Sequence, residues 1–309
     1  MNNREKFKII MVNSFKGGTG KTTVALSHCI HEWKRGQNRL NQEELYYDNI
    51  YFMDIDRLGT SMSYYLFPDK DKQPVYFDEY SEKKAECVCN QVPLRYSNDE
   101  GSRLYAVLLN PVANRRQDYS VQGRMWQHEW IHNGIFQEKL LDFMKECMAM
   151  GRNSLFVVDC SPGVSEMECN LLNEFYTWKK TCSLSVEELY VTTFENGQIW
   201  KTVECLNDTR DLMYRSDREA SIVLNDLQNC IGLTKDDDQM PAVDWEVVGK
   251  EILEKLKDRA HMKIRYKDYK DDQIKAGIWG KVRNLDNITD IYVLPIEYQE
   301  DYISGDRMG

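Results

Sequence analysis

The residues with the clearest capacity for chemistry form a glycine-rich segment near the N-terminus. Residues 7–13 (FKIIMVN) predict a buried strand, SFKGGTGKTT follows, and VALSHCIHEW has the periodicity of a helix. Glycines allow a tight turn in which successive N–H groups and the helix N-terminus point at an anion. The segment therefore predicts a phosphate-binding loop for ATP, made by Gly17, Gly18, Thr19, Gly20, Lys21, Thr22 and Thr23.

Within this loop, two side chains have separate predicted tasks. Lys21 would contact the β- and γ-phosphates, and the Thr22 hydroxyl would be a ligand of Mg²⁺. The alternative is a glycine-rich turn that opens an ordinary helix.

The sequence KGGTGKT resembles the deviant Walker A motif of the ParA/MinD ATPases, which carries an extra lysine early in the loop. Lys16 occupies that place. The resemblance implies that Lys16 reaches the ATP of a second subunit, so that an ATP-dependent homodimer encloses two nucleotides. A second cation near the transferred phosphoryl group would act as an arginine finger does. The alternative is a solvated lysine.

Two further segments end in carboxylates and complete this resemblance. YFMDIDRLG places Asp54 and Asp56 at the end of a strand on the same face, and SLFVVDCSPG leads to Asp159. The resemblance implies that Asp56 orients or activates the attacking water, with Lys16 and Lys21 as the other catalytic residues. Asp54 would support the Mg²⁺ shell, and Asp159 would hold Mg²⁺ through water. The alternative for the Asp54 and Asp56 pair is a strand-end cap.

Departures from the family pattern also occur. Arg57-Leu58 stands where partition ATPases carry Pro-Gln. Asn225 and Pro295, each at the end of a predicted strand, resemble the residues that bracket adenine, although both could equally be turn residues. The resemblance covers Phe7 to Asn225 well and the remainder poorly.

The alternation of apolar runs with helical patterns predicts a doubly wound α/β fold, in which helices cover both faces of a mostly parallel sheet. We expect one domain over residues 1–309, with a polar excursion at 68–102 and a basic, partly helical segment at 244–283. The predicted strands are 7–13, 49–54, 104–110, 154–159, 188–193, 220–225 and 290–294. The predicted helices are 22–34, 136–150, 166–178, 197–214 and 245–260.

The net charge of −10 argues against a protein that coats nucleic acid with its whole surface. Any contact with nucleic acid must therefore be local, and Lys255–Arg283 is the candidate because it carries ten basic and four acidic residues. The resemblance implies a ParA-like switch for DNA partition or cargo positioning, bound to nonspecific DNA and released by a ParB-like activating partner. Two alternatives remain open: a nucleotide-gated switch that binds only proteins, and an ATP-dependent ligase of the dethiobiotin synthetase kind.

Several features bear on location and on competing metal chemistry. The sequence contains no apolar run of membrane-spanning length, no signal peptide and no terminal basic amphipathic helix, so we expect a cytoplasmic protein without membrane contact. Nine irregularly spaced cysteines suit reduced thiols. Residues 128–132 (HEWIH) match a zinc-hydrolase pattern, but Asn133-Gly134 predicts that the helix stops there. Cys87 and Cys89 have no second cysteine pair nearby, which disfavours zinc.

Overall fold

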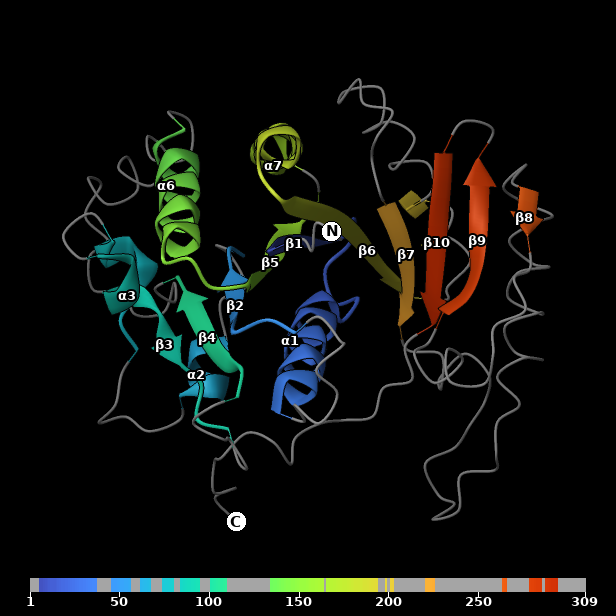
Figure 1. Cartoon of the computed structure of the whole chain (residues 1–309). Helices are drawn as coiled ribbons and strands as arrows, with labels where there is room; N and C mark the ends of the chain where they lie inside the picture. Colours follow the sequence, from blue (N-terminus) through green and yellow to red (C-terminus); the bar gives the residue numbers. More distant parts are fainter. Residues whose placement is uncertain are drawn as a thin grey trace, which may run out of the picture.

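The central element of the computed structural model is one sheet with helices on both faces (Figure 1). The structure describes the following residues: 6–37, 46–56, 62–67, 74–80, 84–94, 101–109, 134–163, 165–193, 198, 201–202, 220–225, 263–265, 278–284 and 287–293.

The described strands form a sheet in the order β3-β4-β2-β5-β1-β6-β7-β10-β9-β8. Its interior is parallel from β4 to β10, and the antiparallel pairs are β3 with β4, β9 with β10, and β8 with β9. The predicted doubly wound, mostly parallel α/β fold is therefore confirmed. The strands are β1 (Phe7–Ser14), β2 (Asn49–Asp54), β3 (Asn90–Gln91), β4 (Arg103–Leu108), β5 (Ser154–Pro162), β6 (Leu184–Thr193), β7 (Ala220–Asn225), β8 (Lys263–Arg265), β9 (Ile278–Asn284) and β10 (Asn287–Val293).

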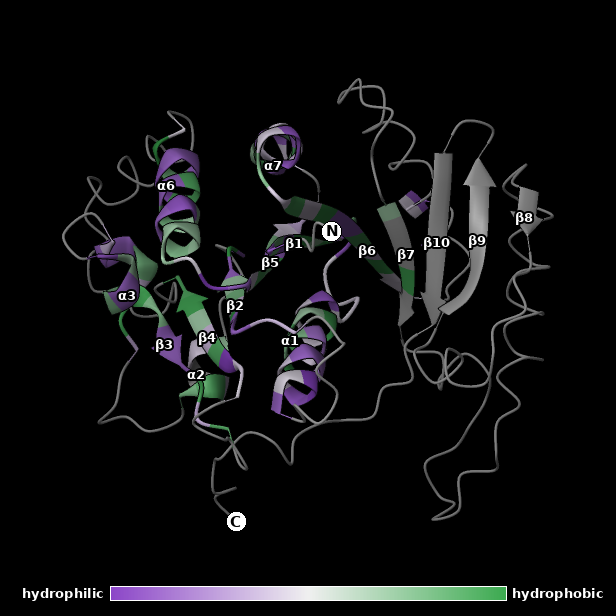
Figure 2. Ribbon diagram, in the orientation of Figure 1, coloured by the Kyte–Doolittle hydropathy of each residue, from purple (hydrophilic) through white to green (hydrophobic). Residues whose placement is uncertain are grey.

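Two apolar layers hold the helices against this sheet. One layer joins α6 (Ile135–Ala149) and α7 (Glu166–Thr181) to the face that carries Ile9 and Met11, and the other joins α1 (Lys21–Gln37) to the opposite face. Residues of β2 and β5 are buried on both faces, as expected for strands inside a parallel sheet. Figure 2 shows the resulting hydrophobic stretches along the strands and the mixed character of the helices. Shorter helical elements among the described residues are α2 (Met62–Leu66), η1 (Phe77–Glu79) and α3 (Ala85–Val88).

The strand order creates the place where a ligand can bind. The chain leaves β1 for β2 on one side, and it leaves β5 for β6 on the other side of β1. Such a change of direction opens a crevice outside the carboxyl ends of the strands. The glycine-rich loop follows β1 at this point.

Most predicted elements that fall on described residues are present with small differences in length. The strands 49–54 and 220–225 have the predicted bounds, and helix 136–150 is shifted by one residue to Ile135–Ala149. Within the segment 244–283, the described residues form β8 and part of β9. The helix predicted at 245–260 and most of that at 197–214 lie outside the described residues.

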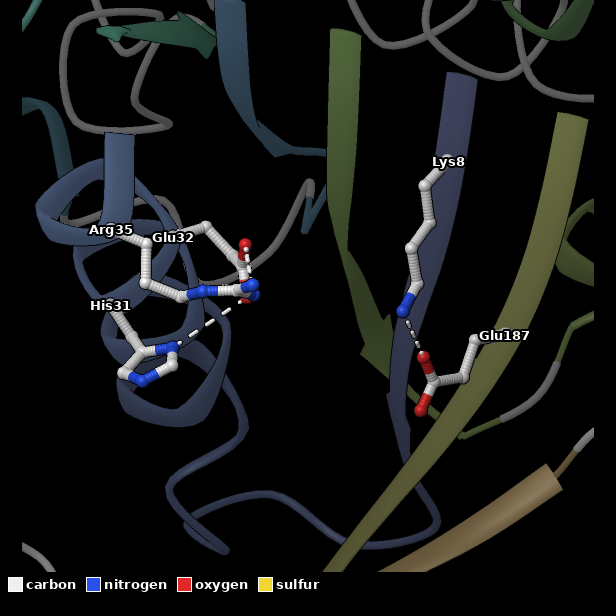
Figure 3. A network of polar contacts seen from close by, with 5 residues as sticks. All are labelled: Lys8, His31, Glu32, Arg35 and Glu187. Atoms are coloured by element: carbon white, nitrogen blue, oxygen red, sulfur yellow. Dashed lines mark hydrogen bonds and ion pairs between the residues drawn. The ribbon is translucent and has the colours of Figure 1, made fainter. Parts of the chain in front are cut away.

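The end of the sheet opposite the glycine loop carries a network of charges (Figure 3). Lys8 of β1 pairs with Glu187 of β6 at 2.7 Å, and Arg35 of α1 donates to both carboxylate oxygens of Glu32 at 3.0 and 3.1 Å. His31 Nδ1 lies 3.6 Å from Glu32 Oε1. Burial opposes the charge of Glu32, but the neighbouring histidines and Arg35 outweigh it and lower its pKa to about 2. The charged form of Glu32 therefore stabilises the folded protein.

No helix among the residues placed by the structure combines the length and the apolar character needed to cross a bilayer.

The depressed pKa of Glu32 predicts a pH-dependent contribution to stability. Its ordinary value of 4.5 falls to about 2 on folding, so the stabilisation is complete above pH 4.5 and is lost as the pH falls toward 2. We expect Glu32→Gln to lower the free energy of unfolding by about 2 kcal/mol at pH 7, and by much less near pH 2. Urea denaturation across this pH range measures the difference.

The matched control is Asp142→Asn. The pair of Asp142 and Lys145 has a similar charge, but its side chains are 68% and 56% exposed. We expect a change below about 0.5 kcal/mol at either pH. An equal loss in the two variants at pH 7 would contradict the assigned role of Glu32.

Candidate active site

The loop between β1 and α1 has the backbone conformation that a phosphate-binding turn requires. Gly18 and Gly20 have φ angles of +78° and +81°, which side chains other than glycine rarely adopt. A Cβ atom at Gly17 or Gly18 would meet nothing within 4 Å, so the backbone there is open to the close approach of a ligand. The Val24 N–H donates to the Gly20 carbonyl at 3.0 Å and begins the helical hydrogen bonding of α1.

Lys21, the first residue of α1, is directed into the interior rather than toward solvent. Its side chain is 6% exposed, and its ammonium donates to Oδ1 of Asp159, whose side chain is 1% exposed. Burial raises the pKa of Asp159, while the charge of Lys21 and the Thr22 hydroxyl oppose that rise. Asp159 Oδ2 is buried and accepts no hydrogen bond of ordinary geometry from the described residues. The Thr22 hydroxyl is nevertheless near enough to lower the pKa of Asp159. The first two residues of α1 thus meet the end of β5.

Asp54 and Asp56 lie beside this pair. Asp54 is opposite Asp159 in the register of β2 and β5, and the Ile55 N–H donates to the Asp159 carbonyl at 3.0 Å. The Asp56 N–H donates to Asp54 Oδ1 at 3.1 Å. Both carboxylates are buried, at 3% and 9% exposure. Burial and the charge of Asp159 raise the pKa of Asp54 to about 8.

The donor set fits a divalent cation held together with phosphate. Lys21 lies within electrostatic reach of Asp54 and Asp159, and Asp56 lies near both carboxyl groups, so another positive charge here would lower the raised pKa values of Asp54 and Asp159. Mg²⁺ is usually held by one or two carboxylates, waters and substrate phosphates rather than by a cage of protein ligands. The part of the chain that the structure describes contains no cluster of three or more His, Cys, Asp or Glu side chains placed to hold a metal ion. Cys87 and Cys89 are free thiols.

The other predicted loop residues differ in exposure. Lys16 and Thr23 are exposed, Thr19 is buried at 3%, and Thr22 is partly buried. An exposed Lys16 is compatible with a contact outside its own subunit, as the motif resemblance implies.

The two residues predicted near the adenine are less defined. Asn225 ends β7, where it lies opposite Thr193 of β6, but its side chain is not described. Pro295, Arg57-Leu58 and the HEWIH segment lie outside the described residues.

A contact that the sequence did not predict joins the loop to the turn after β5. The Gly163 N–H donates to the Ser14 carbonyl at 2.7 Å, and Gly163 has a φ of +87°. Ser165 and Glu168 then form a capping box that begins α7. The motif Ser-x-x-Glu was visible in the sequence, but the pairing of Gly163 with Ser14 depends on strand register.

Comparison with solved structures gives several matches of low sequence identity. A plasmid partition protein from Borrelia burgdorferi is 13% identical, with a TM-score of 0.45 over 79% of this chain and 86% of its own. Apo McdA from Cyanthece is 12% identical, with a TM-score of 0.45 over 71% and 72%. A putative plasmid partition protein from Borrelia burgdorferi, bound to AMPPNP, is 13% identical, with a TM-score of 0.42 over 82% and 98%.

No protein-family model matches the chain, and no curated protein matches it. At the identities and TM-scores of the solved structures, likeness does not extend to activity or partners. The candidate function therefore follows from the loop, its lysines and the three aspartates.

The buried pair of Lys21 and Asp159 predicts a strong effect on stability. Lys21→Ala would leave the Asp159 carboxylate buried without its cation, so we expect the free energy of unfolding to fall by about 3 kcal/mol. Adding Asp159→Asn should recover at least about 1 kcal/mol, because the unpaired charge is then removed. Denaturation in magnesium-free buffer measures both changes.

Lys16→Ala is the control for this measurement, since it removes an exposed lysine from the same loop. Its effect on unfolding should stay below about 0.5 kcal/mol. Equal losses for the two lysine variants would show that the Lys21 pair does not stabilise the fold.

Proposed function

We propose that this protein is a magnesium-dependent ATP hydrolase that works as a ParA-like switch in DNA partition or cargo positioning. One observation supports the proposal most directly: a loop with glycines at positive φ, the buried Lys21 and three buried aspartates meet at the ends of β1, β2 and β5. The aspartates are Asp54, Asp56 and Asp159. This set provides cations and N–H donors for a triphosphate and oxygen ligands for its metal ion.

In this proposal, Lys21 exchanges its contact with Asp159 for the β- and γ-phosphates of ATP. Thr22, Asp54 and Asp159 hold Mg²⁺, directly or through water, and Mg²⁺ when bound neutralises charge on the phosphates. Asp56, whose backbone N–H donates to Asp54 Oδ1, would orient the attacking water.

Lys16 would complete the site of a second copy of the chain. It is exposed at the start of the loop, whereas Lys21 is buried in its own subunit. Two solved structures of similar fold are named plasmid partition proteins, which is the role that the motif resemblance implies. ATP would favour the closed dimer through its differential affinity, and a ParB-like partner would stimulate hydrolysis and release.

The decisive experiment measures the oligomeric state of Asp56→Ala with magnesium and either ATP or ADP. We expect a dimer with ATP and a monomer with ADP by size-exclusion chromatography with light scattering, because hydrolysis is blocked. The variant Asp56→Ala/Lys16→Ala should bind ATP but remain monomeric. A monomer in every condition would contradict the dimeric switch.

Nucleotide binding is tested separately. Lys21→Ala should raise the Kd for a fluorescent ATP analogue by about 100-fold or more, since a charge-assisted contact to phosphate is removed. Circular dichroism under the binding conditions checks that Lys21→Ala is folded, and Lys21→Arg, which retains the positive charge, is the control for the loss of charge. Unchanged affinity in Lys21→Ala would exclude the phosphate-binding role of the loop.

A direct DNA contact is the second part of the proposal, supported by charge at the edge of the sheet. In the antiparallel register of β8 and β9, Lys263 lies opposite Arg283 and Arg265 lies opposite Lys281. Alternate positions of a strand share a face, so these four basic positions belong to one face of the sheet. In the register of β9 and β10, Asp290 is opposite Lys281 and adds one acidic position to this group. The phosphates of DNA would supply anions for the remaining basic positions.

Neutralising Lys263, Arg265 and Lys267 together tests this contact. We expect this triple variant to lose ATP-dependent DNA retention on a filter while its ATPase activity is unchanged. For the natural protein, we expect the affinity for DNA to fall about 100-fold between 50 and 200 mM salt. Replacing Lys34, Lys179 and Lys180 with alanine is the control for a general loss of positive charge. Unchanged retention in the first variant would instead support a switch that binds only proteins, as the net charge of −10 favours.

A further inference from the structure

An aromatic pair joins the start of the glycine loop to the neighbouring strand β6. Phe15 lies between the end of β1 and Lys16, and its ring stacks on Tyr190 with a centroid separation of 5.4 Å and an interplanar angle of 10°. Tyr190 also lies beside Asn13 in the parallel register of β1 and β6. The residue that precedes Lys16 is therefore attached to the sheet by a side-chain contact.

Tyr190 is itself held in place by a buried hydrogen-bond network. Its hydroxyl donates to Glu188 Oε2 at 2.7 Å, and the Tyr176 hydroxyl of α7 donates to Glu188 Oε1 at 3.0 Å. Tyr176, Glu188 and Tyr190 are each 0% exposed. Each carboxylate oxygen of Glu188 thus accepts a hydrogen bond from one tyrosine hydroxyl. The ring of Tyr190 is thereby fixed and presents a rigid surface to Phe15.

Lys16 follows this anchored position and precedes a segment of backbone without side chains. The space where a Cβ would lie is open at Gly17 and Gly18, so packing at these two residues does not restrain the loop. Lys16 itself is exposed. The two neighbours of Lys16 are Phe15 and Gly17, and only Phe15 has a side chain, which contacts Tyr190. The position of Phe15 therefore fixes where the backbone of Lys16 starts.

We propose that Phe15, stacked on Tyr190 and supported by Glu188 and Tyr176, is a positioning residue for Lys16. This inference rests on the proposed function, in which the Lys16 ammonium must reach the phosphates held by a second copy of the chain. A long side chain placed from a fixed origin loses less freedom when it reaches its target, and small errors of placement reduce the rate of a reaction strongly. Phe15 does not touch the reacting atoms, so it acts only through Lys16.

A double-mutant cycle tests whether Phe15 acts through Lys16. The four proteins are the natural chain, Phe15→Ala, Lys16→Ala and the double variant, and kcat is measured at saturating ATP and magnesium with the Kd for a fluorescent ATP analogue. We expect Phe15→Ala to lower kcat about tenfold while the Kd changes less than about threefold. In the Lys16→Ala background, Phe15→Ala should lower kcat no further.

The outcomes separate this inference from the proposed function. If Lys16→Ala has the natural kcat, the role of Lys16 is wrong and the positioning inference falls with it. If Lys16→Ala is slow and the loss from Phe15→Ala is equally large in both backgrounds, only the positioning inference is overturned. A parallel rise in Kd and fall in kcat for Phe15→Ala would also overturn it, because the whole loop would then be disturbed.

Rescue by a conservative change gives an independent test. Phe15→Trp retains a ring that can stack on Tyr190 and should keep kcat within about threefold of the natural chain, whereas Phe15→Leu retains only apolar bulk and should resemble Phe15→Ala. Equal rates for the Trp and Leu variants would show that stacking is not what positions Lys16. Phe15→Leu also replaces Phe15→Ala in the cycle if the alanine variant does not fold.

Discussion

The buried ion pair of Lys21 and Asp159 is the interaction on which the candidate site depends. Removing an ammonium and a carboxylate from water is unfavourable, and a buried pair often stabilises a fold no better than apolar residues of similar size. The pair lies where the first turn of α1 meets the end of β5, and both partners are almost inaccessible to solvent. A charge pair in this position is better explained by chemistry at the site than by a need for stability.

Two further carboxyl groups, those of Asp54 and Asp56, lie beside the pair of Lys21 and Asp159. Asp54 is opposite Asp159 in adjacent strands and shares a hydrogen bond with the backbone of Asp56. Burial together with the charge of Asp159 raises the pKa of Asp54 to about 8, so Asp54 keeps its proton at pH 7 unless another positive charge lowers that pKa. A triphosphate and a divalent cation add charges of both signs. The site is therefore suited to a ligand pair rather than to either ion alone.

The loop is also connected mechanically to both of its neighbouring strands. On one side, the Ser14 carbonyl accepts a hydrogen bond from Gly163, directly before the capping box of α7. On the other side, Phe15 stacks on Tyr190, whose hydroxyl shares Glu188 with Tyr176 of α7. Both contacts lead to α7, the first through the helix N-terminus and the second through its buried face. The start of the loop is thus linked to α7 both through its backbone and through a side chain.

Much of this protein is determined by local sequence. The strands Asn49–Asp54 and Ala220–Asn225 were predictable because short apolar runs end at polar residues, and the loop was predictable because its glycines and lysines are adjacent in the chain. Only the tertiary structure decided that Lys21 faces Asp159, 138 residues away, and that Phe15 meets Tyr190, because such contacts depend on strand order and register. The strands β8 and β9 were not predicted from the sequence, because basic residues interrupt the apolar runs that mark an interior strand.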